Sequence, residues 1–265
     1  MRHTKERFLD DLKGLGIDKK GTLLVHSSMK SIGEVEGGAD TVLDALCEYM
    51  EEGLLVLPTH TWSYIGHDNP KFYVESDKVC VGILPELFRK REGVVRSLHP
   101  THSVAAYGKD AKAFIKDNEK WDTPCARQSP WGRLLDRKAQ IMMLGVDLRR
   151  NTFIHGVEEW AGIPGRLTDE PEQLYVVLAD GTEKNVPSRR HHGDHWSEYF
   201  FKVDEIFEEY RVMHRGEFGD AKVRICQAEG VAELLYEMLE INPHLFSNDI
   251  LIDRELYKGL KMKKF

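Results

Sequence analysis

The chain has few cysteines and no long apolar run. Its four cysteines are widely scattered, at Cys47, Cys80, Cys125 and Cys226. None belongs to a Cys-x-x-Cys pair, which argues against a zinc ribbon, a thioredoxin-type motif and a dense disulfide framework. No segment approaches the roughly 18 apolar residues that a membrane span requires, and the N-terminal segment lacks the apolar core of a signal peptide. These absences predict a cytoplasmic protein with reduced thiols and no membrane partner.

Basic residues are also scarce relative to acidic ones. The chain has 37 Lys and Arg against 44 Asp and Glu, which gives a net charge of −7. Phosphate binding along a nucleic acid needs a basic excess or a basic stripe, so we expect no nucleic-acid partner. Walker loops, Gly-x-Gly-x-x-Gly, His-Glu-x-x-His and Gly-x-Ser-x-Gly patterns are missing as well. The common nucleotide-binding, zinc-protease and serine-hydrolase motifs are thereby excluded.

Apolar runs alternate with helical patterns along the first 150 residues. The runs predict buried strands at 22–25, 54–57, 104–107 and 140–144. The apolar spacing predicts helices at 4–15, 38–50, 82–91, 110–118 and 130–135. A strand, a helix and a second strand within about 35 residues favour a βαβ unit and hence a parallel sheet.

The pattern changes after residue 165. Two β-rich segments flank Asp180-Gly181, and Asp-Gly is a favoured two-residue turn, so a β-hairpin is predicted there. Helices near 197–211 and 230–239 close the chain. We therefore expect one α/β domain spanning 1–265, with a central, mostly parallel sheet flanked by helices and a C-terminal antiparallel appendage.

Polar residues gather in loops that follow the predicted strands, where α/β folds collect their ligands. The loop 26–33 offers hydroxyls, Gly33 and Lys30 to an anion. The loop 58–64 mixes hydrogen-bonding and aromatic groups, which suits a pocket wall. Two further polar loops lie at 96–103 and 122–130. In the second of them, Ser129-Pro130 is typical of a helix start.

A short motif follows the last predicted strand. Asn151 and Thr152 suit a helix start, and His155 and Glu158 are three positions apart. Side chains at i and i+3 share one face of a helix, so the Glu158 carboxylate can reach the His155 imidazole. A carboxylate fixes the tautomer of an imidazole and raises its basicity, which suits a general base near neutral pH.

Four segments together resemble the aminoglycoside N3-acetyltransferase family in order and spacing. They are HSSMKSIG, RSLHPTHS, TPCARQSPWGRL and LGVDLRRNTFIHGVE. The most diagnostic matches are Arg96-Ser97…Pro100…Ser103 and Thr152…His155…Glu158. The resemblance extends from about residue 4 to the C-terminal helices and implies the α/β fold of that family.

The resemblance implies acetyl transfer from acetyl-coenzyme A to an amine. His155 would be the base and Glu158 would orient it. A thioester oxyanion needs N–H donors, which the loop 26–33 or the helix start near Thr152 could supply. The residues implied to border the coenzyme are His26, Ser27, Ser28, Ser31, Gly33, Arg96, Ser97, Ser103 and Ser129.

The amine acceptor is less well defined by the sequence. The residues expected near it are His60, Trp62, Asp122, His191 and His192. A carboxylate at Asp122 would hold a polyamine, whereas the three His and two Arg of the segment 189–196 would repel one. The identity of the acceptor therefore stays open at this point.

Two alternatives also remain. The side chains of His191, His192, Asp194 and His195, with His60, His99 or His102, contain the donor types of a metal-dependent hydrolase. A protein that binds coenzyme A without catalysis is the other alternative. The favoured interpretation, acetyl transfer by His155, needs no metal ion.

Overall fold

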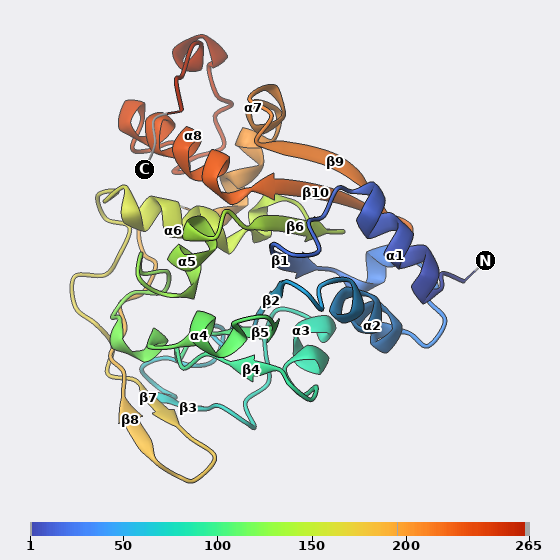
Figure 1. Cartoon of the computed structure of the whole chain (residues 1–265). Helices are drawn as coiled ribbons and strands as arrows, with labels where there is room; N and C mark the ends of the chain where they lie inside the picture. Colours follow the sequence, from blue (N-terminus) through green and yellow to red (C-terminus); the bar gives the residue numbers. More distant parts are fainter. Residues whose placement is uncertain (1, 195, 263–265) are drawn as a thin grey trace.

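A seven-stranded sheet forms the centre of the molecule (Figure 1). The computed structural model describes residues 2–194 and 196–262. The strand order is β4-β5-β2-β1-β6-β10-β9. These strands are β1 (Thr22–Ser27), β2 (Leu54–Pro58), β4 (Val95–Arg96), β5 (Val104–Gly108), β6 (Gln140–Leu144), β9 (Met213–Phe218) and β10 (Ala221–Gln227).

Most strands of the sheet point in the same direction. Strand β1 pairs in parallel with β2 on one side and β6 on the other. Strands β5 and β10 run antiparallel to the neighbours on both of their sides. Five of the seven strands therefore point the same way, and the predicted β1–helix–β2 unit is confirmed as parallel.

Helices cover both faces of the sheet (Figure 1). One face carries α1 (Lys5–Gly14), α2 (Ala39–Tyr49) and α3 (Ile83–Phe88), and the other carries α4 (Ala111–Ile115), α5 (Pro130–Asp136), α6 (Thr152–Trp160) and α8 (Ala228–Ile241). Alternate side chains of each central strand face opposite layers. Leu24 belongs to the core under α5 and α6, whereas Leu23 and Val25 belong to the core under α1 and α2.

A small second sheet forms the predicted appendage. Strands β7 (Tyr175–Val177) and β8 (Glu183–Asn185) make the antiparallel hairpin expected around Asp180-Gly181, where Gly181 has a φ of 82°. Strand β3 (Lys71–Tyr73) pairs in parallel with β7. The sequence did not predict β3. Because β3 pairs with β7, the appendage contains a segment from earlier in the chain in addition to the hairpin.

The structure differs from the sequence prediction near the C-terminus. The segment 197–211, predicted as one helix, is a 3₁₀ helix η4 (Ser197–Val203) followed by α7 (Asp204–Glu209). Strands β9 and β10 were not predicted, and neither was β4. Charged side chains interrupt β9 and β10, so these strands lack the continuous apolar run that identified β1, β2 and β6.

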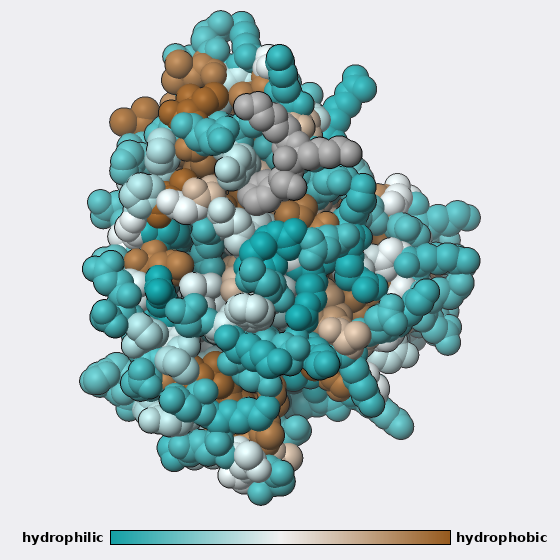
Figure 2. All heavy atoms as spheres, turned by 60° about the vertical axis from the view of Figure 1, so that its left-hand side comes forward, coloured by the Kyte–Doolittle hydropathy of each residue, from teal (hydrophilic) through white to brown (hydrophobic). Residues whose placement is uncertain are grey.

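Figure 2 shows hydrophilic side chains over most of one face of the molecule. Apolar side chains gather towards its upper end, where the C-terminal elements lie (Figures 1 and 2). Exposed apolar residues of this part of the chain are Ile250, Leu251 and Leu256. Among the described residues, no helix has both the length and the apolar character needed to cross a membrane.

Candidate active site

Helix α6 positions the central residues of the site. It begins at Thr152 as predicted, and Asn151 is its N-cap, with Oδ1 accepting from the N–H of Phe153 at 3.2 Å. An Asn cap satisfies one of the free N–H groups at a helix start. Because the register of the helix is fixed there, Thr152, His155 and Glu158 follow one another on the same face.

The predicted contact between His155 and Glu158 is confirmed. His155 Nδ1 lies 3.0 Å from Glu158 Oε2, and the carboxylate is completely buried. Burial lowers the pKa of His155 below its ordinary value, although the hydrogen bond that the Glu158 carboxylate accepts raises it. Burial has the larger effect, so His155 is uncharged at neutral pH and one ring nitrogen can accept a proton.

Arg166 is a third member of this group that the sequence did not reveal. Its Nε lies 2.9 Å from Glu158 Oε2, and its side chain is only 3% exposed. Its Nη2 lies 2.6 Å from His155 Nδ1, while Nη1 donates to the carbonyl of His192. Arg166 therefore neutralises the buried carboxylate and connects α6 to the segment that carries His191.

A cluster of uncharged histidines surrounds His155. His60 Nε2 lies 3.1 Å from the Thr152 hydroxyl. The ring of His102 lies 4.7 Å from that of His60 and 5.3 Å from that of His191, which in turn lies 4.7 Å from His155. Burial lowers the pKa of His60, His102 and His191 well below the ordinary value. The loops after β2 and β4 thus meet α6.

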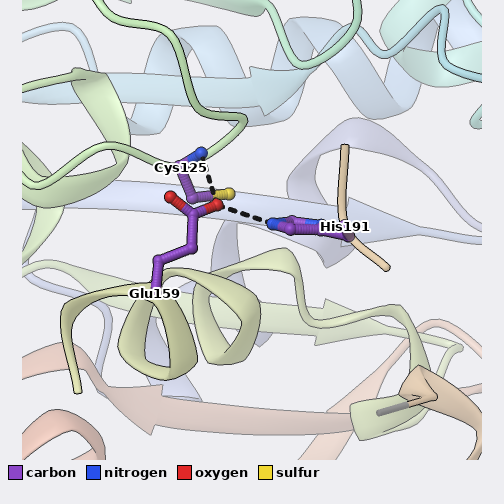
Figure 3. A group of neighbouring side chains, drawn as sticks. All are labelled: Cys125, Glu159 and His191. Carbon is purple, nitrogen blue, oxygen red and sulfur yellow. Dashed lines mark hydrogen bonds and ion pairs between the residues drawn. The ribbon is translucent and has the colours of Figure 1, made fainter. Parts of the chain in front are cut away.

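A carboxylate, a thiol and an imidazole converge beside α6, next to this cluster (Figure 3). Glu159 Oε1 accepts from the backbone N–H of Cys125 at 2.9 Å and lies 2.6 Å from His191 Nε2. Burial raises the pKa of Glu159 to about 8 and that of the Cys125 thiol well above its ordinary value. Sequence reasoning gave Cys125 no role in the site and did not place Glu159 beside it.

The first loop lies at the carboxyl end of β1 and is tied to the end of β6. Ser28 N donates to Leu144 O, and the Ser31 hydroxyl donates to Ser28 Oγ and to Gly145 O. His26 and Ser27 belong to β1 itself, and burial lowers the pKa of His26 to about 3. Gly33 has a φ of 91°, and a Cβ there would collide with the Asp220 carboxylate, so only glycine fits.

The other residues implied to border the coenzyme make bonds within the protein. Arg96 donates to the carbonyls of Thr59, Val74 and Asp77. The Ser97 hydroxyl accepts from Val104 N and Asn118 Nδ2, and the Ser103 hydroxyl donates to Thr59 O. Ser129 caps α5, as predicted. These contacts hold the loop 96–103 against the loop 59–61, which carries His60.

Three of the residues expected near the acceptor lie at the surface. Trp62 is 45% exposed, Asp122 forms an ion pair with Arg189 at 3.3 Å, and His192 is exposed. Asp194 is exposed too, whereas His195 lies outside the described residues. Among the described histidines of the segment 189–196, His191 alone enters the buried cluster, so the structure does not bring together the set required for the metal-dependent hydrolase.

Comparisons with known proteins identify the family of this chain. The family model for aminoglycoside 3-N-acetyltransferase matches residues 24–240. Aminoglycoside N(3)-acetyltransferase VII of Streptomyces paromomycinus is 33% identical over 67% of this chain and 67% of its own. The prophage-derived aminoglycoside N(3')-acetyltransferase-like protein YokD of Bacillus subtilis is 31% identical over 84% of this chain and 87% of its own.

A solved structure supports the same relationship. Aminoglycoside acetyltransferase AAC(3)-IVa, in a mutant form with a bound gentamicin, superposes with a TM-score of 0.81 and 27% identity over 99% of this chain and 95% of that one. The family match covers most of the chain, including His155, Glu158 and Arg166. The chain therefore belongs to the aminoglycoside 3-N-acetyltransferase family.

Proposed function

We propose that this enzyme transfers the acetyl group of acetyl-coenzyme A to an amine of an aminoglycoside, with His155 as the general base. The buried His155–Glu158–Arg166 group carries the proposal, because it holds an uncharged imidazole beside a neutralised carboxylate. The base is the tautomer in which His155 Nδ1–H donates to Glu158 Oε2 and Nε2 keeps the lone pair. The Arg166 guanidinium only donates, so in this tautomer it bonds the Glu158 carboxylate and not Nδ1. Nε2 is then the proton acceptor.

The reaction needs one base and a site for the oxyanion. The amine nitrogen attacks the thioester carbonyl while His155 Nε2 takes the N–H proton. The tetrahedral intermediate then loses coenzyme A as the C–S bond breaks, and the proton reaches the leaving thiolate. We propose that Thr152, at the start of α6, helps to hold the oxyanion, since it lies one helical turn before His155.

We further propose that the coenzyme lies along the loop 26–33, where His26, Ser27, Ser28, Ser31 and Gly33 edge the carboxyl ends of β1 and β6. The side chains of Arg96, Ser97 and Ser103 contribute indirectly, because their polar atoms hold the neighbouring loops in place. Ser129 sets the start of α5 in the same way.

The charges around the site are compatible with a cationic acceptor. Arg189 pairs with Asp122 at 3.3 Å and Arg190 with Glu172 at 3.8 Å, while His191 is uncharged. The segment 189–196 therefore repels a polyamine less than its composition predicts. Gentamicin and apramycin bound to AAC(3)-IVa make aminoglycosides the first acceptors to test. Four free cysteines favour a cytoplasmic location, where disulfides are rare.

A thiol-release assay with acetyl-coenzyme A tests the function. Gentamicin, apramycin, a simple alkyl amine and an amino sugar are supplied as separate acceptors. We expect release to depend on acceptor and to be fastest with an aminoglycoside, because its multiple ammonium groups are attracted to a chain of net charge −7. Mass spectrometry of the product should show one added acetyl group. Equal, acceptor-independent thiol release would identify hydrolysis instead, and no release at all would favour a binding protein.

The pH dependence of Glu158→Gln tests the base. The acceptor amine ionises identically in both enzymes, so the difference between their profiles reports His155. Glu158 raises the pKa of His155, and its removal should lower that pKa further. Because the base works in its neutral form, activity is lost as the pH falls through this pKa. We expect the acid limb of the pH profile of kcat/KM to move to lower pH in Glu158→Gln. The maximum value of kcat/KM should be smaller as well. Superimposable acid limbs would show that the Glu158 carboxylate does not act on the base.

A further inference from the structure

Three separate segments bring metal-binding atoms together beside α6 (Figure 3). Cys125 comes from the loop before α5, Glu159 from α6 itself and His191 from the segment after β8. The sulfur, one carboxylate oxygen and one ring nitrogen all lie within 4.8 Å of one another. Cys125 is completely buried, and the other two side chains are nearly so.

We propose that Cys125, Glu159 and His191 bind a thiophilic divalent cation of the zinc class. Thiolate, imidazole and carboxylate are the ligands that zinc takes in proteins, in a tetrahedron with sulfur at about 2.3 Å and nitrogen or oxygen at about 2.0–2.2 Å. A thiolate selects against magnesium and calcium, which prefer oxygen. The fourth position is left for water or for a further ligand.

The electrostatics of the trio suit such an ion. A thiolate and a carboxylate carry two negative charges, which a divalent cation offsets in a buried place. The Cys125 thiol and the Glu159 carboxyl, whose pKa burial raises to about 8, both release their protons to water when they bind the metal. The nearby cation Arg166 is already paired with Glu158 at 2.9 Å. Glu159 Oε2 is buried, and hydrogen bonds from Thr123 and from the Cys125 N–H favour the charged form of this carboxylate, which is the form that binds a cation.

A bound ion would act on the neighbouring base by fixing its surroundings. The His191 ring lies 4.7 Å from the His155 ring, and Arg166 donates to the backbone of the next residue, His192. Coordination would anchor the segment that carries His191 and His192 onto α6 and onto the loop that carries Cys125. This inference concerns metal binding and does not depend on acetyl transfer.

Cobalt binding tests the site directly. The whole protein is stripped with a chelator, dialysed and titrated with Co²⁺, whose thiolate complex absorbs in the near ultraviolet. We expect one equivalent to bind with this thiolate band, and Zn²⁺ to displace it. Cys125→Ala should abolish the band, and His191→Ala should weaken binding by more than the about 10- to 100-fold caused by losing an outer partner of a ligand. Zn²⁺ should also raise the thermal midpoint of the native sequence but not that of Cys125→Ala.

Cys226→Ala is the matched control, because Cys226 is an equally buried thiol located on β10. We expect it to keep the cobalt band at full intensity. Circular dichroism of the metal-free variants shows whether each is folded. A native protein without the band, or a Cys125→Ala variant with an unchanged band, would overturn the proposal. No substrate is present in these titrations, so their failure leaves acetyl transfer untouched, and an inactive enzyme can still confirm the metal site.

Discussion

Replacing His155 with Ala is expected to lower kcat/KM for acetyl-coenzyme A by about 100- to 10,000-fold, the usual contribution of a positioned general base. The imidazole is the uncharged group held by Glu158 and Arg166, and alanine leaves no proton acceptor in its place. Thiol release from acetyl-coenzyme A with a saturating aminoglycoside measures the loss. Affinity for coenzyme A, measured by calorimetry, should change little, because His155 is not among the residues proposed to border the coenzyme.

His67→Ala serves as the control for this substitution. His67 is exposed on the loop between β2 and β3, so its removal should leave both transfer and coenzyme binding unchanged. An activity of His155→Ala near that of the native protein would remove His155 from the mechanism. A parallel loss of coenzyme binding would instead assign it to the binding of the donor.

Replacing Arg166 with Met is expected to cost about 3–5 kcal/mol of unfolding free energy, because removing one partner of a buried ion pair leaves the other charge uncompensated. Arg166 is 3% exposed and Glu158 is completely buried. Urea unfolding at neutral pH measures this change. Acetyl transfer should fall as well, since the carboxylate that orients His155 loses its own anchor.

Arg149→Met is the matched control. Arg149 pairs with Asp147 at 2.6 Å, but its side chain is 44% exposed, and exposed ion pairs contribute about 0–1 kcal/mol. The double variant Arg166→Met with Glu158→Gln completes the test. It should be less destabilised than the sum of the two single variants, because no buried charge is then left unpaired. Strict additivity would contradict a coupled ion pair.

The sequence predicted the parts of the fold that short-range patterns specify. Continuous apolar runs identified β1, β2 and β6, and the spacing of His155 and Glu158 identified a contact within one helix. Strand β10 escaped because Lys222 and Arg224 alternate with its buried residues, which weakens the pattern of a buried strand. It lies between β6 and the edge strand β9, where Lys222 reaches solvent and Arg224 pairs with Asp204 at 2.6 Å.

The missing members of the site come from positions distant in sequence. Arg166 reaches Glu158 across the turn after α6, and His191 and Cys125 approach Glu159 from separate loops. No periodicity within a helix or strand encodes these approaches, since they depend on how the loops pack. The ion pairs of Arg189 and Arg190 are of the same kind, which is why composition alone overstated the positive charge of the segment 189–196.

The position of β6 between β1 and β10 has a consequence for how the protein is made. Strand β10 begins 77 residues after β6 ends (221 minus 144), and a ribosome adding about 5–20 residues per second needs roughly 4–15 s to cover that distance. Until then the edge of β6 has no neighbour, and α8 has not yet been made to pack against α6. His155 therefore acquires its final surroundings only after α8 has been made.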